Sequence, residues 1–512
     1  MSRHLRRTSA VLNKKGSPPE SIATTVRPSS SSPLSPQGRE ATPTDVLRRP
    51  IEETPKPSFL NSLRKTSMPS STISSTPPPT APPGRIPLAL RGGAYVRNGP
   101  NPQHLPGGTH HIFDGDGMLH CLHLSAGSDD TAPATFCSRY VQTCRYLLER
   151  EAGRNVLPNI FSGMNGVNGL MDLSAAIGLA NIGLGYFGGR LFALGEADLP
   201  YAIHLSPSGD VITIGRWDFG KDPITGEVFA FRCCPVPPFV TYFRFDAEGK
   251  KQPDVPIFSV RHPSYLHDFA ITEKYAIFCD MQIVMQTLQI VLGSGFPFGT
   301  DARKVPRVGI LPRYAASDSD IRWFDVPGFN PLHTINAWED DGGDTVVLVA
   351  PNVLSLEHAL DRMELVHFCV EMVRIDLRTG AVSRTPLSAG NLDFGVINPC
   401  YLGRRNRYAY LGLDMVKKGV DCVTASRMYG PWRFGGEPIF VPAPDEGEEE
   451  DDGYLVTYLH DENTGESSFL VMDARSPDLQ VVAEVSLPRR VPYGFHGLFI
   501  TAAELRAQKG KP

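Results

Sequence analysis

From Ile86 onward, apolar residues occur in short runs of valine, isoleucine, phenylalanine and tyrosine that are separated by turn-forming residues. Three of the turns contain an aspartate followed closely by a Thr-Gly pair, at residues 221–227, 376–380 and 461–466. Glycine readily adopts the positive φ angle that a tight turn between antiparallel strands requires. The pattern therefore predicts β-hairpins, each followed directly by a strand, as at residues 228–231.

Hairpins of this kind recur at intervals of tens of residues, with few helical patterns between them. A β-sandwich would need fewer and more evenly spaced strands. Sheets repeated around an axis fit the pattern better, so we expect an all-β fold of the β-propeller type. No strict sequence repeat gives the number of blades.

Three segments carry helical or membrane-binding patterns. Residues 354–374 place apolar side chains at nearly helical spacing, and residues 170–184 are rich in alanine, glycine and leucine, as a helical cap would be. Residues 281–292 could form an amphipathic helix at a membrane surface. A strand followed by a buried helix explains that segment equally well. No run of 18 or more apolar residues predicts a transmembrane span.

The amino-terminal part differs in composition from the rest of the 512 residues. Residues 1–50 are rich in serine, threonine, proline and arginine and poor in acids, and residues 70–83 form a Pro/Ser/Thr tract. This composition lacks the apolar core of a secretory signal and is typical of organellar transit peptides. We expect a disordered transit and linker segment over residues 1–83 and one folded domain over residues 84–512; a disordered cytosolic tail is the alternative.

The charges are mixed along the chain and sum to −5, with no block of lysine and arginine. A nucleic-acid partner is therefore not expected. The acidic residues 445–452 are interpreted as a solvated loop. The nine cysteines are scattered without a paired spacing, which is typical of reduced thiols outside the secretory pathway.

Three histidines, far apart in the chain, each lie in an apolar or glycine-rich frame: His267, His333 and His496. A closed fold could bring such residues to one point on its axis. Neutral imidazole is the commonest protein ligand of transition metals, and a site without thiolate suits Fe, Zn, Cu or Ni. These histidines are the candidate metal ligands.

Several short segments around these histidines form a recognisable set. Residues 97–102 and 111–118 lie near the start of the domain, and residues 195–201, 391–394 and 435–438 carry acidic side chains. Together with the histidine frames, they resemble the plant carotenoid cleavage dioxygenases over residues 86–500. Segments 235–239, 257–260 and 487–492 are closest to the plastid class-four branch of that family.

The resemblance implies a seven-bladed β-propeller with a small α-helical cap and Fe(2+) on its axis. It implies a dioxygenase that uses dioxygen to cleave a conjugated double bond of a carotenoid, giving apocarotenoid carbonyl products. Such a protein would act in the chloroplast, in the stroma or at a plastoglobule, and would take its substrate from a membrane or lipid-droplet surface. An apolar tunnel is expected, with candidate lining residues Phe329, Trp338, Phe394, Tyr429 and Phe495.

The same resemblance identifies Glu196, Asp393 and Glu437 as carboxylates that would accept the second ring N–H of the ligand histidines and fix their orientation. Asp393 is shorter than the glutamate usual in the family, so its reach is the least certain. The sequence leaves open which carboxylate serves which histidine.

Members of the family hold iron with four histidines, and the first lies in a Thr-Ala-His-Pro-Lys segment before the turn at residues 221–227. Here about a dozen residues are absent between residues 215–220 and that turn, and the histidine is absent with them. Asp218 is the one nearby side chain that could substitute as a ligand. A second shortening follows residues 411–415. A splice form, an imperfect gene model or a degraded paralogue would explain both, and the alternative function is carotenoid or lipid-droplet binding without catalysis.

Overall fold

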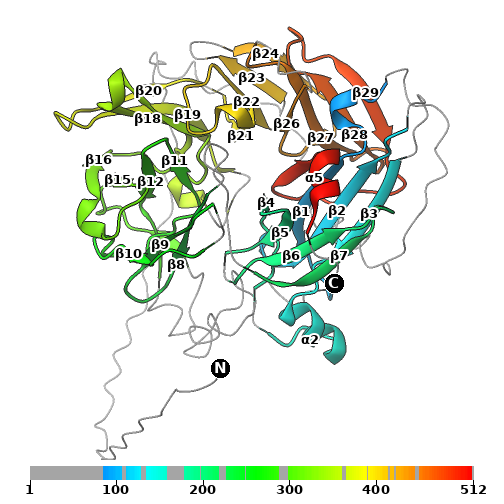
Figure 1. The fold of residues 1–512 in the computed structure, drawn as a ribbon, viewed down its shortest axis with the longest axis horizontal. Coiled ribbons are helices and arrows are strands. Elements are labelled where there is room, and N and C mark those ends of the chain that lie inside the picture. Colours follow the sequence, from blue (N-terminus) through cyan, green and yellow to red (C-terminus); the bar gives the residue numbers. More distant parts are fainter. Residues whose placement is uncertain are drawn as a thin grey trace, which may run out of the picture. The chain divides into compact units, whose positions relative to one another are not determined.

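The computed structural model describes residues 85–509, apart from 106–110, 128–133, 158–177, 197, 218–226, 248–249, 287–297, 360–361, 363–364, 389, 413–414, 420–422 and 444–448. All described residues belong to one compact unit, residues 57–512. Strands dominate it, and they form seven antiparallel sheets, called blades 1 to 7 below, together with one two-stranded hairpin. Figure 1 shows the seven sheets set around a common centre.

The first four blades follow one another in chain order. Blade 1 contains β1 (Ala94–Asn101), β2 (Asp116–Leu124), β3 (Ala134–Tyr140) and the carboxyl-terminal β30 (Gly497–Ile500); blade 2 contains β4 (Gly183–Phe187), β5 (Arg190–Leu194), β6 (Tyr201–Leu205) and β7 (Val211–Arg216); blade 3 contains β8 (Val228–Cys233), β9 (Val240–Phe245) and β10 (Val255–Pro256); and blade 4 contains β11 (Phe269–Ile271), β12 (Tyr275–Asp280), β15 (Arg307–Pro312) and β16 (Arg322–Asp325).

The remaining blades complete the circle. Blade 5 contains β17 (Asn336–Asp340), β18 (Thr345–Val353), β19 (Phe368–Asp376) and β20 (Val382–Pro386); blade 6 contains β21 (Asp393–Val396), β22 (Tyr408–Gly412), β23 (Met415–Gly419) and β24 (Val423–Arg427); blade 7 contains β25 (Arg433–Gly435), β26 (Ile439–Pro442), β27 (Gly453–Asp461), β28 (Ser467–Asp473) and β29 (Val481–Ser486); and the separate hairpin is β13 (Ile283–Met285) with β14 (Phe298–Thr300).

Pairing of the two ends of the domain closes the ring. β30, the last strand, pairs antiparallel with β1, the first, from Ala94 opposite Ile500 to Arg97 opposite Gly497. Blade 1 is therefore built from both ends of the folded domain, which is how a propeller removes the open edge that a linear array of sheets would leave. The predicted seven-bladed β-propeller is confirmed.

The predicted hairpins lie where the turn pattern places them. Asp376 Oδ1 accepts hydrogen bonds from the backbone N–H groups of Arg378 and Thr379, both at 2.8 Å, and Gly380 has φ of 78°. The turn at residues 461–466 repeats this arrangement between β27 and β28, with Gly465 at φ of 72°. Residues 221–226 lie outside the described residues, but the strand expected after them begins at Val228.

The helix predicted over residues 354–374 is wrong. A single 3-10 turn occupies Leu356–His358, and Phe368–Asp376 is the strand β19, which pairs with β18 on one side and β20 on the other. Val370, Val373 and Ile375 are buried on it. Their β-branched side chains favour the pleated, half-buried surface of a sheet over a helix.

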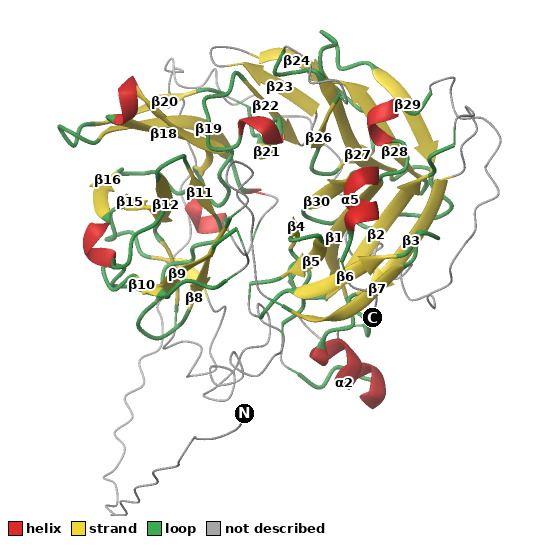
Figure 2. Cartoon of the chain, viewed as in Figure 1, coloured by secondary structure: helices red, strands yellow, loops and turns green. Residues whose placement is uncertain are grey.

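Helices are few, as Figure 2 shows. The cap predicted over residues 170–184 lies mostly outside the described residues, and its end, from Gly183, is strand β4.

The segment proposed as a membrane-surface helix starts differently. Residues 283–285 are strand β13, so the helical interpretation is wrong there, and residues 287–297 lie outside the described residues. The helices among the described residues are α2 (Cys144–Ala152), α5 (Ala502–Ala507) and the 3-10 turns η2 (Leu88–Leu90), η3 (Asp318–Asp320), η4 (Asp341–Gly343), η5 (Leu356–His358) and η7 (Pro399–Tyr401).

No helix in the described ranges is long and apolar enough to cross a bilayer.

The acidic segment at residues 445–452 is described only from residue 449. There Glu450 departs from the solvated loop that was predicted, because its carboxylate accepts hydrogen bonds from the backbone N–H groups of Arg407 at 2.6 Å and Tyr408 at 2.7 Å. This contact fixes the start of β22.

Blade 3 differs from the other blades in strand number. Its described residues form three strands, whereas the other six blades have four or five. The second shortening, predicted after residues 411–415, has no such effect, since blade 6 contains four strands including β23 and β24.

Candidate metal centre

The three candidate ligand histidines meet at one point. His267, His333 and His496 each offer a ring nitrogen within 4.8 Å of the other two. Their ring centroids are 5.0 Å apart for His267 and His333, 5.3 Å for His333 and His496, and 6.5 Å for His267 and His496. Each residue lies just before the edge strand of its blade, β11, β17 or β30. These edge strands therefore face the propeller axis.

Each histidine has one of the three predicted carboxylates as its partner. His333 Nδ1 lies 3.0 and 3.1 Å from the two oxygens of Asp393, and His496 Nδ1 lies 2.9 Å from Glu437 Oε1. His267 Nδ1 makes the corresponding hydrogen bond to Glu196. An ionised carboxylate only accepts hydrogen bonds, so in the neutral imidazole that binds a metal, Nδ1 carries the proton and Nε2 keeps its lone pair. These contacts show which carboxylate pairs with which histidine, a question that the sequence left open.

The short side chain of Asp393 reaches its histidine because of the backbone around it. Asp393 is the first residue of β21, where the register with β22 is irregular. Phe394, the next residue, has a φ of 52°, in the left-handed region that bulky residues seldom occupy. Its ring packs against His333 at 5.4 Å and His496 at 5.9 Å. The strained backbone thus brings both the carboxylate and an apolar wall to the site.

The charges at the centre favour ionised carboxylates. Burial raises the pKa of Glu196, but the His267 ring and the hydrogen bond from it outweigh burial, so the pKa is lower than usual. The pKa of Asp393 is also lowered, since His333 outweighs burial there. Conversely, burial lowers the pKa of His333, but Asp393 outweighs it and raises the pKa to about 9.

Two residues that sequence reasoning missed reinforce the centre. The Tyr265 hydroxyl donates to Glu196, with its oxygen 2.8 and 2.9 Å from the two carboxylate oxygens. Asp268 Oδ2 accepts hydrogen bonds from the backbone N–H and the hydroxyl of Thr334, both at 2.7 Å. Because Asp268 follows His267 and Thr334 follows His333, this contact links two ligand-bearing loops.

The blades divide the functional side chains between them. Blades 4, 5 and 1 supply the histidines, and blades 2, 6 and 7 supply Glu196, Asp393 and Glu437. In the described part of blade 3, no residue joins the centre. Asp218, the suggested substitute ligand, lies outside the described residues.

Three imidazoles with carboxylate-held tautomers form a nitrogen donor set suited to a transition metal, and they leave further coordination positions for other ligands. Of the aromatic residues considered for a tunnel, Phe394 contacts the histidines. Phe495 packs against Phe113, with ring centroids 5.1 Å apart. Phe329, Trp338 and Tyr429 are buried in hydrophobic clusters between strands.

Comparison with known proteins identifies the family. The model of the family described as RPE65, Retinal pigment epithelial membrane protein, matches residues 70–501. This chain belongs to the RPE65 family of carotenoid oxygenases. Among curated members, 9-cis-epoxycarotenoid dioxygenase NCED1, chloroplastic, of Oryza sativa subsp. japonica is 59% identical over 84% of this chain and 75% of its own length.

Two further relatives belong to the carotenoid-cleaving members of the family. The probable carotenoid cleavage dioxygenase 4, chloroplastic, of Arabidopsis thaliana is 55% identical, over 82% of this chain and 78% of its own. The zeaxanthin 7,8(7',8')-cleavage dioxygenase, chromoplastic, of Crocus sativus is 56% identical, over 66% of this chain and 100% of its own.

Solved structures share the fold at lower identity. Lignostilbene dioxygenase of Pseudomonas brassicacearum superposes with a TM-score of 0.70 at 24% identity, covering 84% of this chain and 98% of its own. Cobalt-substituted ACO of Synechocystis superposes with a TM-score of 0.69 at 24% identity, covering 83% of this chain and 97% of its own.

Proposed function

We propose that this protein binds Fe(2+) through His267, His333 and His496 and cleaves a conjugated double bond of a carotenoid with dioxygen, giving apocarotenoid carbonyl products. The convergence of three imidazoles, each held by its own carboxylate, is the observation that carries the proposal. The names of the plant relatives, which act on carotenoids, support the substrate class.

The bound metal would supply the activation of dioxygen. The chain's own residues then do two things. Glu196, Asp393 and Glu437 hold each Nδ1 proton, so that the Nε2 lone pairs point to one place. Phe394 covers the histidine rings with an apolar surface, which suits a polyene and excludes water.

We further propose that the set of ligands is incomplete in this chain. Blade 3 has three described strands, which fits the loss of the segment that carries the first histidine in the family. Three imidazoles would hold the ion less firmly than four. Since a displacement of about 1 Å can cost on the order of 100-fold in rate, weak iron binding and slow cleavage are expected. Asp218 is the candidate substitute ligand.

The metal proposal is tested by iron content after purification, together with chromatography of carotenoids incubated with the protein in air. His333→Ala should abolish bound iron, because a set of three cannot lose another member and hold the ion. His358→Ala is the matched control. His358 lies 3.9 Å from Glu357 and is not one of the three converging histidines. Stoichiometric iron in His333→Ala would show that this histidine is structural. Carotenoid retained without cleavage would favour the non-catalytic binding role.

We also propose that the protein acts in plastids, in the stroma or at a plastoglobule surface. The relatives named chloroplastic or chromoplastic and the composition of residues 1–83 support this. A fusion of residues 1–83 to a fluorescent reporter should enter chloroplasts. A uniform cytosolic signal would contradict the targeting proposal.

A further inference from the structure

Two arginines contact the same strand where blade 1 meets blade 7. Arg97, on β1, is 3% exposed; its Nη2 donates to the carbonyl oxygen of Pro492, and its guanidinium lies over the Tyr458 ring at 5.1 Å. Arg490 is half-buried in the loop before β30; its Nε donates to His460 Nε2 at 3.2 Å. Tyr458 and His460 are two apart on β27, so both arginines approach the same face of that strand.

These contacts leave several donors without acceptors. The Nε of Arg97 and both Nη1 and Nη2 of Arg490 are buried and make no hydrogen bond. Within the described part of the chain, neither guanidinium has a carboxylate oxygen within 4.0 Å. A buried charge without a partner is strongly unfavourable, so these groups call for an anion.

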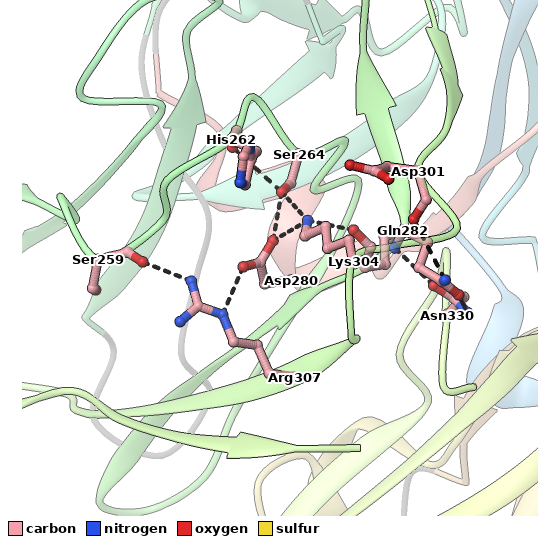
Figure 3. Close-up of polar contacts among 10 residues, drawn as sticks. Ser259, His262, Ser264, Asp280, Gln282, Asp301, Lys304, Arg307 and Asn330 are labelled. Atoms are coloured by element: carbon pink, nitrogen blue, oxygen red, sulfur yellow. Dashed lines mark hydrogen bonds and ion pairs between the residues drawn. The ribbon is translucent and has the colours of Figure 1, made fainter. Parts of the chain in front are cut away.

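Several other cations in the interior of this protein have carboxylate partners. In Figure 3, Lys304 and Arg307 both contact Asp280, which is 2% exposed. On α2, the buried Arg145 lies 3.3 Å from Glu149. The two arginines beside β27 make no such ion pair in the described part of the chain.

The surroundings of the two arginines hold an excess of positive charge. Burial, followed by Arg97, Arg490 and Arg489, lowers the pKa of the nearby His120 to about 3, so that histidine stays neutral. Glu462, the carboxylate that acts on Arg490, accepts a hydrogen bond from the Tyr493 hydroxyl at 2.6 Å and lies 4.0 Å from His460 Nε2. That carboxylate is therefore already engaged.

We propose that Arg97 and Arg490 form a binding site for a small inorganic anion of the halide class. A halide accepts hydrogen bonds from any direction, so it suits three N–H donors that come from two side chains. These donors are buried, so an ion that reaches them must give up its water, which favours a small anion. Arg490, the more exposed of the two, lies on the solvent side, where an ion would enter.

The site is tested by thermal unfolding of the full-length protein in sodium chloride and in sodium gluconate at the same ionic strength. An ion that binds only the folded state raises the midpoint temperature in a saturable way. We expect chloride to raise the midpoint by about 2 °C relative to gluconate. Arg490→Gln should abolish this difference, whereas Arg490→Lys, which keeps the charge, should retain part of it.

Arg475→Gln is the control, because Arg475 lies on the surface of the same blade and pairs with Asp452 at 2.6 Å. It should keep the full chloride response. A merely structural role of Arg490 would lower the midpoint of Arg490→Gln equally in both salts and leave the chloride difference intact, which overturns the proposal. Equal midpoints of the unmodified protein in chloride and gluconate would overturn it as well.

Discussion

Blades 3 and 4 are neighbours that differ at the edge facing the axis. Blade 4 has β11 there, a strand of three residues that follows His267. Blade 3 has β8 as its first described strand, and β8 is packed directly against blade 4, with the rings of Phe231 and Phe269 5.3 Å apart. Cys233, at the end of β8, donates its thiol to the carbonyl oxygen of Leu266 at 3.6 Å.

The difference between these blades distinguishes the residues that stabilise the fold from those that form the metal site. The inner strand of blade 4 is short and contributes little backbone pairing, but the loop before it carries a histidine. The described strands of blade 3 bury apolar side chains against blade 4, in one cluster that contains Phe229, Tyr242, Phe278 and Leu311. The proposed loss of an inner strand would therefore affect the metal centre more than the hydrophobic core.

The largest expected effect comes from completing blade 3. An insertion of about a dozen residues with a Thr-Ala-His-Pro-Lys core between Asp218 and Asp222 should raise both iron content and carotenoid cleavage. Correct placement of the ion should increase the rate on the order of 100-fold. Metal analysis and product chromatography measure the two effects.

The same insertion with alanine in place of its histidine is the matched control, since it restores a strand without a ligand. It should leave iron content unchanged. If the unmodified chain already cleaves carotenoids at a rate that the insertion does not improve, the ligand set is complete without it. Asp218→Ala then becomes the next variant to measure.

The second prediction concerns blade 4, where charged side chains hold the strands together. Asp280, on β12, contacts Arg307 Nε at 2.8 Å as well as Lys304 and Ser264 (Figure 3). Asp280→Asn leaves two cations without their carboxylate, so we expect a loss of about 3–5 kcal/mol in the free energy of unfolding. Chemical denaturation measures the loss.

Asp301→Asn is the control, because Asp301 pairs with Arg303, which is 94% exposed, and an exposed pair of this kind adds little to stability. The pH dependence provides a second readout. Burial raises the pKa of Asp280, but Lys304 outweighs it, and the pKa is lower than usual. The stabilisation is therefore present above the ordinary aspartate pKa and is lost as the pH falls through the lowered value. Equal acid sensitivity of Asp280→Asn and the unmodified protein would contradict this role.

Local patterns allowed much of the fold to be predicted. The Asp–Thr–Gly turns were identified because a turn depends on neighbouring residues. Residues 354–374 were wrongly predicted as a helix because apolar positions such as Leu356 and Leu360 mimic helical spacing, whereas pairing with β18 and β20 decides the structure of β19.

The candidate site was only partly predictable. The histidines and carboxylates were found through their frames, but their pairing depends on which blades face each other across the axis, and the sequence alone does not give that arrangement. The left-handed backbone of Phe394 carried no sequence signal, since such a conformation is uncommon for phenylalanine. Tyr265 did carry a sequence signal. It precedes His267 by two residues, and in an extended segment residues two apart point to the same side.

The smallest expected effect tests how Tyr265 supports the histidine of blade 4. Tyr265→Phe removes only the hydroxyl that donates to Glu196 and keeps the ring, which stacks on His267 at 5.8 Å. Glu196 would then hold His267 with one fewer constraint, and iron affinity should fall by up to about 10-fold, the lower end of the effect of such supporting residues. Titration of the metal-free protein with Fe(2+) under anaerobic conditions measures the affinity. Tyr454→Phe, on blade 7, is the control and should leave the affinity unchanged. An unaltered affinity in Tyr265→Phe would mean that the Glu196 carboxylate is oriented by His267 alone.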